Sequence, residues 1–328
     1  MDLCIAVQDL AARHRLDGEG YRRLRQLAGL DAPPPSLQRW TPVGIGALAA
    51  ALVGLGLVFW VAANWAALGR FGQFAVLEAL VVAGGVAAWL RPGVQRAALA
   101  LLALLGTGAL WAFFGQTYQT GADAWQLFAL WAALMLPLAL AVRSDIVWAP
   151  WAVVAVTGVA LWMQTHTAHR WRFEAQDLRP QLVGWAAALL IVGGLSAAGR
   201  RWTGAGLWSL RTAVVLAAAV ITGTALGGLF QARVGLQYPL GLLVLVAVAA
   251  GFASRRAFDL FGLSALVLAL NGALVAGLAR WLFADGSRGA GDPIGRTLLI
   301  GLVAAGLLAA SVSWVLALAR ARRAQGIA

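Results

Sequence analysis

The side chains best suited to chemistry in this chain lie in two short segments of its first half. The segment at residues 111–131, WAFFGQTYQTGADAWQLFALW, carries amides, hydroxyls, a carboxylate and indoles, and it contains no basic residue. The segment at residues 61–74, VAANWAALGRFGQF, adds an amide and another indole. Such groups bind polar ligands or lipid head groups, although the same residue types also form ordinary interfacial belts at the ends of membrane spans. The candidate ligand-binding residues are Asn64, Trp65, Gln116, Tyr118, Gln119, Asp123 and Trp125.

Glu78 is a further candidate because it is an acidic residue inside an apolar run, QFAVLEALVVAGG. A carboxylate in hydrocarbon costs on the order of several kcal/mol unless it is paired or neutralised, so such residues usually face the interior of a bundle. Arg70 lies eight residues earlier and could approach only along the helix. We therefore expect a partner from another helix or a loop, and a functional role and a structural hydrogen bond both stay open.

No familiar catalytic or metal motif accompanies these residues. His166 and His169 lie three apart, with Glu174 and Asp177 nearby, but two histidines without a fixed third ligand indicate a metal only weakly. The chain lacks a P-loop, a nucleophile elbow, an HExxH motif and a GxGxxG segment after a strand. We assign no catalytic residue and expect neither a metal nor a cofactor.

Other polar residues favour structural roles. Asn271 lies midway in an apolar run, where an amide commonly bridges helices. Asp259 follows Arg255 and Arg256 at helical spacings of four and three, which predicts an interfacial ion pair between neighbours in the chain.

Short polar turns and small residues complete this pattern. Arg143 and Asp145 flank a tight turn, and we expect them to contribute to membrane topology. The segment GTALG at residues 223–227 is a GxxxG pattern, and Gly84 with Gly85 lies at the centre of another apolar run. Small residues at such positions indicate close helix packing.

The elements that must position these residues follow from composition. Of 328 residues, 61% are hydrophobic and 12% are charged, whereas soluble domains have about 45–50% and about 25%. This excess excludes a soluble domain and predicts an all-α, polytopic transmembrane bundle. At roughly 20 apolar residues per span, the ceiling is about ten spans. We expect them at residues 43–63, 73–90, 97–114, 124–142, 146–163, 181–198, 212–230, 236–253, 259–279 and 297–319.

A small region precedes the bundle. Residues 1–31 read as two short helices around Leu16, Asp17 and Gly18, and three prolines follow as a stiff hinge. We therefore expect a helical hairpin with its hinge at residues 1–35 and a transmembrane bundle at residues 40–328. The first 40 residues are charged and show no cleavable signal peptide.

The basic residues indicate orientation rather than nucleic-acid binding. The formal charge is +12 and all 25 basic residues are Arg, placed in short clusters between apolar runs. Counted on alternate sides of the ten spans, 17 Arg lie with the termini and eight lie on the other side. Both termini are therefore expected to be cytoplasmic, with membrane lipids as partners and no nucleic acid.

The first half resembles a known family. A short helical N-terminal segment, FWVAANWAALGRFGQF, and FFGQTYQTGADAWQLFALWAALMLPLAL resemble the bacterial membrane proteins of domain of unknown function 2157, over about residues 1–165. Residues 181–328 carry only general membrane character. The resemblance implies an integral protein of the bacterial cytoplasmic (inner) membrane, and it supplies no reaction or ligand. It rests on Asn64, Trp65, Gly115, Gln116, Tyr118, Gln119, Gly121, Ala122 and Asp123.

Three functional hypotheses follow. The leading one is a non-enzymatic membrane protein that binds or passes a small polar or amphipathic molecule at one outer-side site formed by the candidates above. The second is a membrane-embedded enzyme acting on a lipid-linked substrate, with Glu78 or Asp123 as acid or base. Two carboxylates converging on one cavity would favour the enzyme. The third is an assembly or scaffold component.

Overall fold

The described part of the chain is helical and, in those residues, contains no strand. The computed structural model describes residues 3–30, 35–63, 65–118, 121–167, 178–255, 257–284 and 293–324. The all-helical bundle predicted from composition is confirmed.

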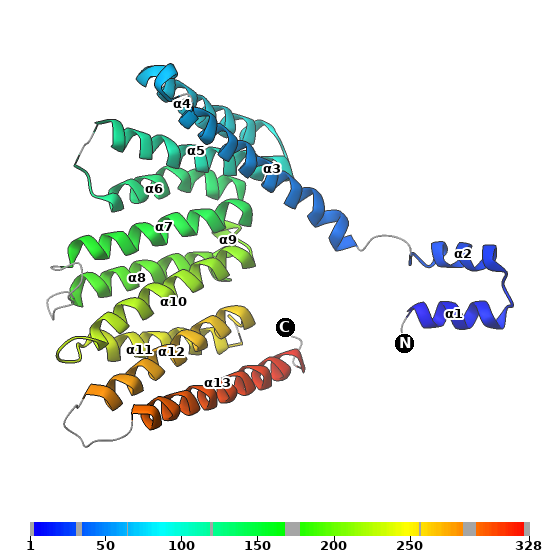
Figure 1. The fold of residues 1–328 in the computed structure, drawn as a ribbon. Helices are drawn as coiled ribbons and strands as arrows, with labels where there is room; N and C mark the ends of the chain where they lie inside the picture. The colour runs from blue at the N-terminus through cyan, green and yellow to red at the C-terminus, as the bar shows by residue number, and fades with distance from the viewer. Residues whose placement is uncertain are drawn as a thin grey trace.

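Two short helices open the chain, α1 (Leu3–Arg13) and α2 (Gly18–Leu27), and they lie side by side in Figure 1. Asp17 precedes α2 in extended conformation, and its carboxylate accepts a hydrogen bond from the Gly20 amide at 2.8 Å. This N-cap satisfies one of the amides that a helix start leaves without a partner. The connection between α1 and α2 covers residues 14–17, so Leu16 and Asp17 lie in it as expected, whereas Gly18 is the first residue of α2.

Ten longer helices follow in the residues that the structure describes, and each overlaps one predicted span. Eight of them are long and apolar enough to cross a membrane, whereas α11 has 17 residues and the apolar part of α3 runs from Trp40 to Gly56. Ten spans is therefore an approximate number. The helices are α3 (Pro35–Ala63), α4 (Trp65–Leu90), α5 (Val94–Tyr118), α6 (Ala124–Val142), α7 (Asp145–His166), α8 (Leu178–Leu195), α10 (Leu207–Leu229), α11 (Gln237–Ala253), α12 (Leu260–Ala284) and α13 (Pro293–Ala324); a short helix, α9 (Arg200–Thr203), separates α8 from α10.

The long helices from α4 to α13 lie roughly in chain order across the molecule (Figure 1), whereas α3 crosses α4 and α5. Helix α10 packs against α7, α8, α11 and α12, whereas α13 packs mainly against α12 and α3 mainly against α5. The core therefore gathers in the second half of the chain, around α10.

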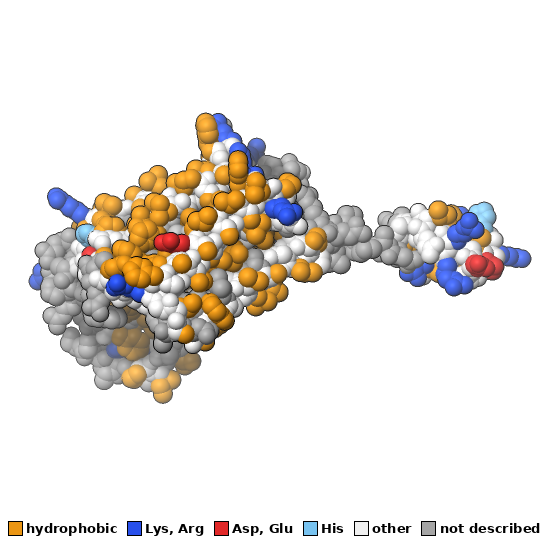
Figure 2. Space-filling model, turned by 90° about the horizontal axis from the view of Figure 1, so that it is seen from above, with side chains coloured by type: hydrophobic (Ala, Val, Ile, Leu, Met, Phe, Trp, Pro, Cys, Tyr) orange, Lys and Arg blue, Asp and Glu red, His pale blue; other side chains and the backbone are white. Residues whose placement is uncertain are grey.

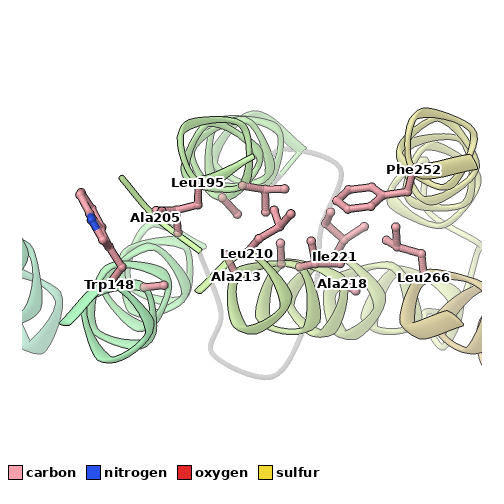
Figure 3. Packing of buried hydrophobic residues seen from close by; sticks show 14 of the residues in the cluster. Trp148, Leu195, Ala205, Leu210, Ala213, Ala218, Ile221, Phe252 and Leu266 are labelled. Atoms are coloured by element: carbon pink, nitrogen blue, oxygen red, sulfur yellow. The ribbon is translucent and has the colours of Figure 1, made fainter. Parts of the chain in front are cut away.

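At the centre of that core, aliphatic and aromatic side chains of α8, α10, α11 and α12 pack together. Figure 3 shows Leu195, Leu210, Ile221 and Phe252 converging between α8, α10 and α11, with Leu266 of α12 beside them. Each of these five side chains is at most 7% exposed. The contacts fix the second half as one packed unit.

Polar side chains also connect helices within this unit. The ion-pair partner of Asp259 is not the one predicted from the sequence. The carboxylate of Asp259 pairs with Arg211 of α10, at 2.9 Å between Oδ1 and Nη2, and not with the neighbouring Arg255. Its Oδ2 also accepts the Gly262 amide at 2.7 Å, in the first turn of α12. The predicted helical spacing fails because the segment before α12 is not helical.

Asn271 behaves as predicted. Its amide nitrogen donates to the Ser311 hydroxyl at 2.8 Å and so links α12 to α13.

The close helix packing predicted at the glycines is found at some of them and not at others. A Cβ at Gly84 would lie 3.1 Å from the Ala103 nitrogen of α5, whereas a Cβ at Gly85 or Gly223 would meet no atom within 4 Å.

Candidate functional site

A pocket of about 730 Å³ lies between the end of α5 and the start of α6. It is partly open to its surroundings and combines amide and carboxylate groups with aromatic and aliphatic walls. Two of the predicted residues, Gln116 and Asp123, lie in its lining. The lining residues are Trp111, Ala112, Phe114, Gly115, Gln116, Gly121, Ala122, Asp123, Ala124, Gln126, Leu127 and Leu130.

The connection between the two helices sets the polar end of this pocket. Gly121 has a φ of 65°, a left-handed conformation that glycine adopts without steric cost. Asp123 follows at the N-cap position of α6 with φ −64° and ψ 146°, but its side chain makes no capping hydrogen bond. The Asp123 side chain is therefore exposed in the lining of the pocket, as is that of Gln116.

An aromatic cluster backs one wall of the pocket. The ring of Phe114, a lining residue, lies 4.8 Å from the ring of Tyr118, and Phe74 of α4 lies 5.9 Å from Tyr118 and 4.6 Å from Phe113. These offset contacts stabilise the junction of α4 and α5. Tyr118 therefore contacts the lining residue Phe114 but is not itself part of the lining.

Trp125 turns toward α7 instead of the pocket. Its ring lies 6.0 Å from the ring of His166, which stacks on Trp162 at 4.6 Å. The Trp125 indole nitrogen is buried and has no hydrogen-bond partner among the described residues. His166 Nδ1 lies 2.8 Å from the Trp162 carbonyl, so this ring nitrogen is already engaged within its own helix.

Glu78 lies outside the pocket lining, on an exposed face of α4. It follows Phe74 by four residues, which is one helical turn. In the part of the chain that the structure describes, its carboxylate has no hydrogen bond or ion pair with another side chain. The expected orientation toward the bundle interior is wrong. Figure 2, which views the molecule from the side of α3 and α4, shows acidic colour within a largely hydrophobic face.

The remaining sequence-predicted residues lie wholly or partly outside the described residues. Asn64 and Gln119 are not described, and Trp65 is described only as the first residue of α4. His169, Glu174 and Asp177 also lie outside. Among described residues, no group of three or more His, Cys, Asp or Glu side chains is placed to hold a metal ion.

Sequence reasoning missed the apolar part of the pocket. Leu127 follows Asp123 by four residues and Leu130 follows Leu127 by three, which places all three on one side of α6. Trp111 and Phe114 of α5 have the same spacing relation, three residues apart. This periodicity is visible in the sequence, but it is equally typical of a helix face that contacts lipid. Only the fold distinguishes a pocket wall from a lipid-facing surface.

The charge of the pocket restricts the kinds of ligand that it can bind. Among the described lining residues, Asp123 is the only charged side chain, and the other strongly polar groups are the neutral amides of Gln116 and Gln126. A carboxylate without a neighbouring cation disfavours an anionic ligand and favours a neutral or cationic one. The aromatic faces of Trp111 and Phe114 also suit a cation. The second carboxylate that an acid–base pair requires is not in this lining.

The matched segment of the chain includes this whole site. Residues 8–148 match a family described as "Predicted membrane protein (DUF2157)". The resemblance inferred from the sequence is confirmed. The DUF2157 match runs from α1 to the first turn of α7, so it contains the pocket and the aromatic cluster but leaves out α8 to α13. No curated protein and no solved structure matches the chain. The family and the apolar helices together show a multi-pass membrane protein of unknown function.

Proposed function

We propose that this protein binds or passes a small amphipathic molecule with a neutral or cationic head at the pocket between α5 and α6. The protein is further proposed to reside in the cytoplasmic (inner) membrane of a bacterium, with both termini cytoplasmic. The observation that carries the proposal is the combination, in one pocket of about 730 Å³, of an exposed carboxylate and two amides at the loop end with apolar walls along the helices.

The division of the lining supports an amphipathic ligand. Gln116, Asp123 and Gln126 offer hydrogen-bonding groups for a head, while Leu127 and Leu130 offer an apolar surface for a short tail. Pockets for small molecules typically have this composition, with few polar groups that fix orientation in a mostly apolar wall. The volume lies within the usual range of about 300–1,000 Å³ for such sites.

Binding is tested by thermal unfolding of the purified protein in detergent, with decyltrimethylammonium as a cationic probe and decanoate as its anionic counterpart. A ligand that binds only the folded state raises the midpoint of unfolding. We expect the cation to raise the midpoint of the natural protein more than the anion does. The variant Asp123→Asn should lose that preference, and Gln116→Ala should weaken the response to the cation.

Matched controls separate the pocket from general effects of charge and polarity. Glu19→Gln removes an exposed carboxylate on α2, and Gln164→Ala removes an exposed amide on α7, and neither residue lines the pocket. Both should respond like the natural protein. An equal response of Asp123→Asn and the natural protein to both probes would show that the assigned site is wrong. Uptake of the cation into proteoliposomes then separates passage from binding.

Glu78 requires its own variant, since it does not line the pocket. If Glu78→Gln changes uptake but not the thermal response, the carboxylate acts on passage and not on binding at the pocket. If both stay unchanged, Glu78 does not belong to this function.

A further inference from the structure

A second surface, at the opposite ends of these helices, has different chemistry. A groove of about 940 Å³ runs between α3, the end of α4 and the start of α5. Its polar members, Arg91 and Gln95, lie together at one end, and the rest of the lining is small or aliphatic. The lining residues are Pro42, Ile45, Gly46, Ala49, Val53, Ala87, Arg91, Gln95, Ala98, Leu99 and Leu102.

The length of the groove corresponds to one leaflet of a bilayer. From Pro42 to Val53 the lining spans 11 residues of α3, or about 16 Å at about 1.5 Å per residue. Half of a typical hydrocarbon core is about 15 Å. At the far end the groove closes where α3 approaches α5, because a Cβ at Gly54 would lie 3.3 Å from Leu102 Cδ1.

The polar end carries positive charge, and no described acidic side chain pairs with it. Arg91 is exposed, and neither it nor Gln95 has a side-chain hydrogen bond or ion pair with another described residue. No acidic residue lines the groove, and the acidic residue on α4, Glu78, is 13 residues away, or about 20 Å along the helix. The neighbouring Arg96 has a buried Nε without a hydrogen-bond partner in the described residues.

From these three features we infer that the groove binds one phospholipid with an anionic head group, its phosphate at Arg91 and Gln95 and one acyl chain along α3. Guanidinium groups bind phosphate oxygens by charge-assisted hydrogen bonds, and basic pockets between membrane helices suit anionic head groups. The occupant is a lipid and not a soluble ligand, because the apolar part of the groove lies along apolar stretches of three helices. This site is separate from the pocket between α5 and α6, and the lipid proposal does not depend on the function proposed for that pocket.

The test is a lipid titration of the delipidated, full-length protein, followed by native mass spectrometry. The two probes are phosphatidylglycerol and phosphatidylcholine with identical acyl chains. We expect one phosphatidylglycerol molecule to bind with higher affinity than phosphatidylcholine. One Arg near a membrane surface contributes about 1 kcal/mol to anionic-lipid binding, so Arg91→Gln should lower phosphatidylglycerol affinity about fivefold and leave phosphatidylcholine affinity unchanged.

Two further variants make the result specific. Ala49→Phe fills the groove at an exposed position and should reduce binding of both lipids. Arg323→Gln removes an exposed Arg in the last turn of α13, outside the groove, and should bind like the natural protein. Equal affinity of the natural protein for the two lipids overturns the inference, as does retention of full phosphatidylglycerol affinity in Arg91→Gln or in Ala49→Phe. A dimer that Ala49→Phe dissociates would overturn it in favour of a second copy of the chain.

Discussion

The carboxylate of Asp145, at the start of α7, lies 2.6 Å from the hydroxyl of Ser209 in the first turn of α10. The same carboxylate accepts the backbone amides of Gly206 at 2.7 Å, Trp208 at 3.1 Å and Ser209 at 3.2 Å. These amides belong to the start of α10, where a helix lacks internal acceptors. A side chain of one helix therefore caps another, so the purely topological role predicted for Asp145 is too limited.

Removing this cap should destabilise the protein. Asp145→Ala leaves amides at the start of α10 without an acceptor, so we expect the free energy of unfolding to fall by about 2 kcal/mol. The measurement is thermal or denaturant unfolding in detergent. Asp9→Ala is the control because the Asp9 pair with Arg13 is on exposed side chains and such pairs contribute little. Identical unfolding of the two variants would contradict a capping role.

The pair of Arg211 and Asp259 gives a second prediction. Asp259 is 7% exposed, and it accepts hydrogen bonds from both Nε and Nη2 of Arg211, which also lies over the rings of Trp208 and Phe261 at 5.4 Å each. Loss of one partner leaves the other charge poorly solvated, so Arg211→Leu and Asp259→Leu should each cost about 3 kcal/mol. The double variant should cost less than the sum, as a double-mutant cycle would measure. Strictly additive costs would mean that the two side chains do not interact.

Two glycines in neighbouring helices should respond oppositely to the same substitution. A Cβ at Gly108 of α5 would lie 2.3 Å from the Trp131 ring, whose Nε1 donates to the Leu104 carbonyl at 2.8 Å and is thereby held in place. Gly108→Ala should therefore destabilise the protein by about 1–3 kcal/mol. Gly85→Ala meets open space and should be neutral or stabilising by up to about 1 kcal/mol, because alanine favours the helix. Equal melting temperatures would show that Trp131 moves aside freely.

The hydrogen bond between α12 and α13 should have a smaller effect. Bonds of this kind within membranes contribute about 0.6 kcal/mol on average, so Asn271→Ala should lower stability by roughly that amount. Ser264→Ala is the matched control, since the Ser264 hydroxyl bonds to the Leu260 carbonyl of its own helix. Thermal unfolding in detergent should give a lower midpoint for Asn271→Ala than for Ser264→Ala. The same midpoint in both would indicate that the amide does not hold α13.

Hydropathy was sufficient for the existence and order of the long helices, because each span needs a run of apolar residues whatever its neighbours are. Hydropathy misplaced the ends of helices whose first or last turns contain polar residues and continue beyond the apolar run. The second span was expected to begin at residue 73, but α4 begins at Trp65, with a kink at Gly69. This extension places Glu78 farther from the start of its helix than expected.

Contacts between distant residues were beyond the reach of the sequence. Asp259 has Arg residues three and four positions before it, yet it pairs with Arg211, 48 positions away. Local spacing cannot reveal this, because the choice depends on how α10 and α12 pack. For the candidate site, the polar cluster at Gln116 and Asp123 was readable from residue types alone. The separation of Trp125 and Glu78 from that pocket depends on which helix face each occupies, and the sequence left those faces undecided.

The arrangement of the helices around α10 has a consequence for biosynthesis. Helices α3 to α9 can pack on one another as each leaves the ribosome, because their partners precede them or follow closely in the chain. The partners of α10 lie on both sides of it, in α7 and α8 and in α11 and α12. The second half therefore acquires its final packing only after α12 has entered the bilayer, whereas the α5 to α6 pocket can form while the ribosome is still translating the rest.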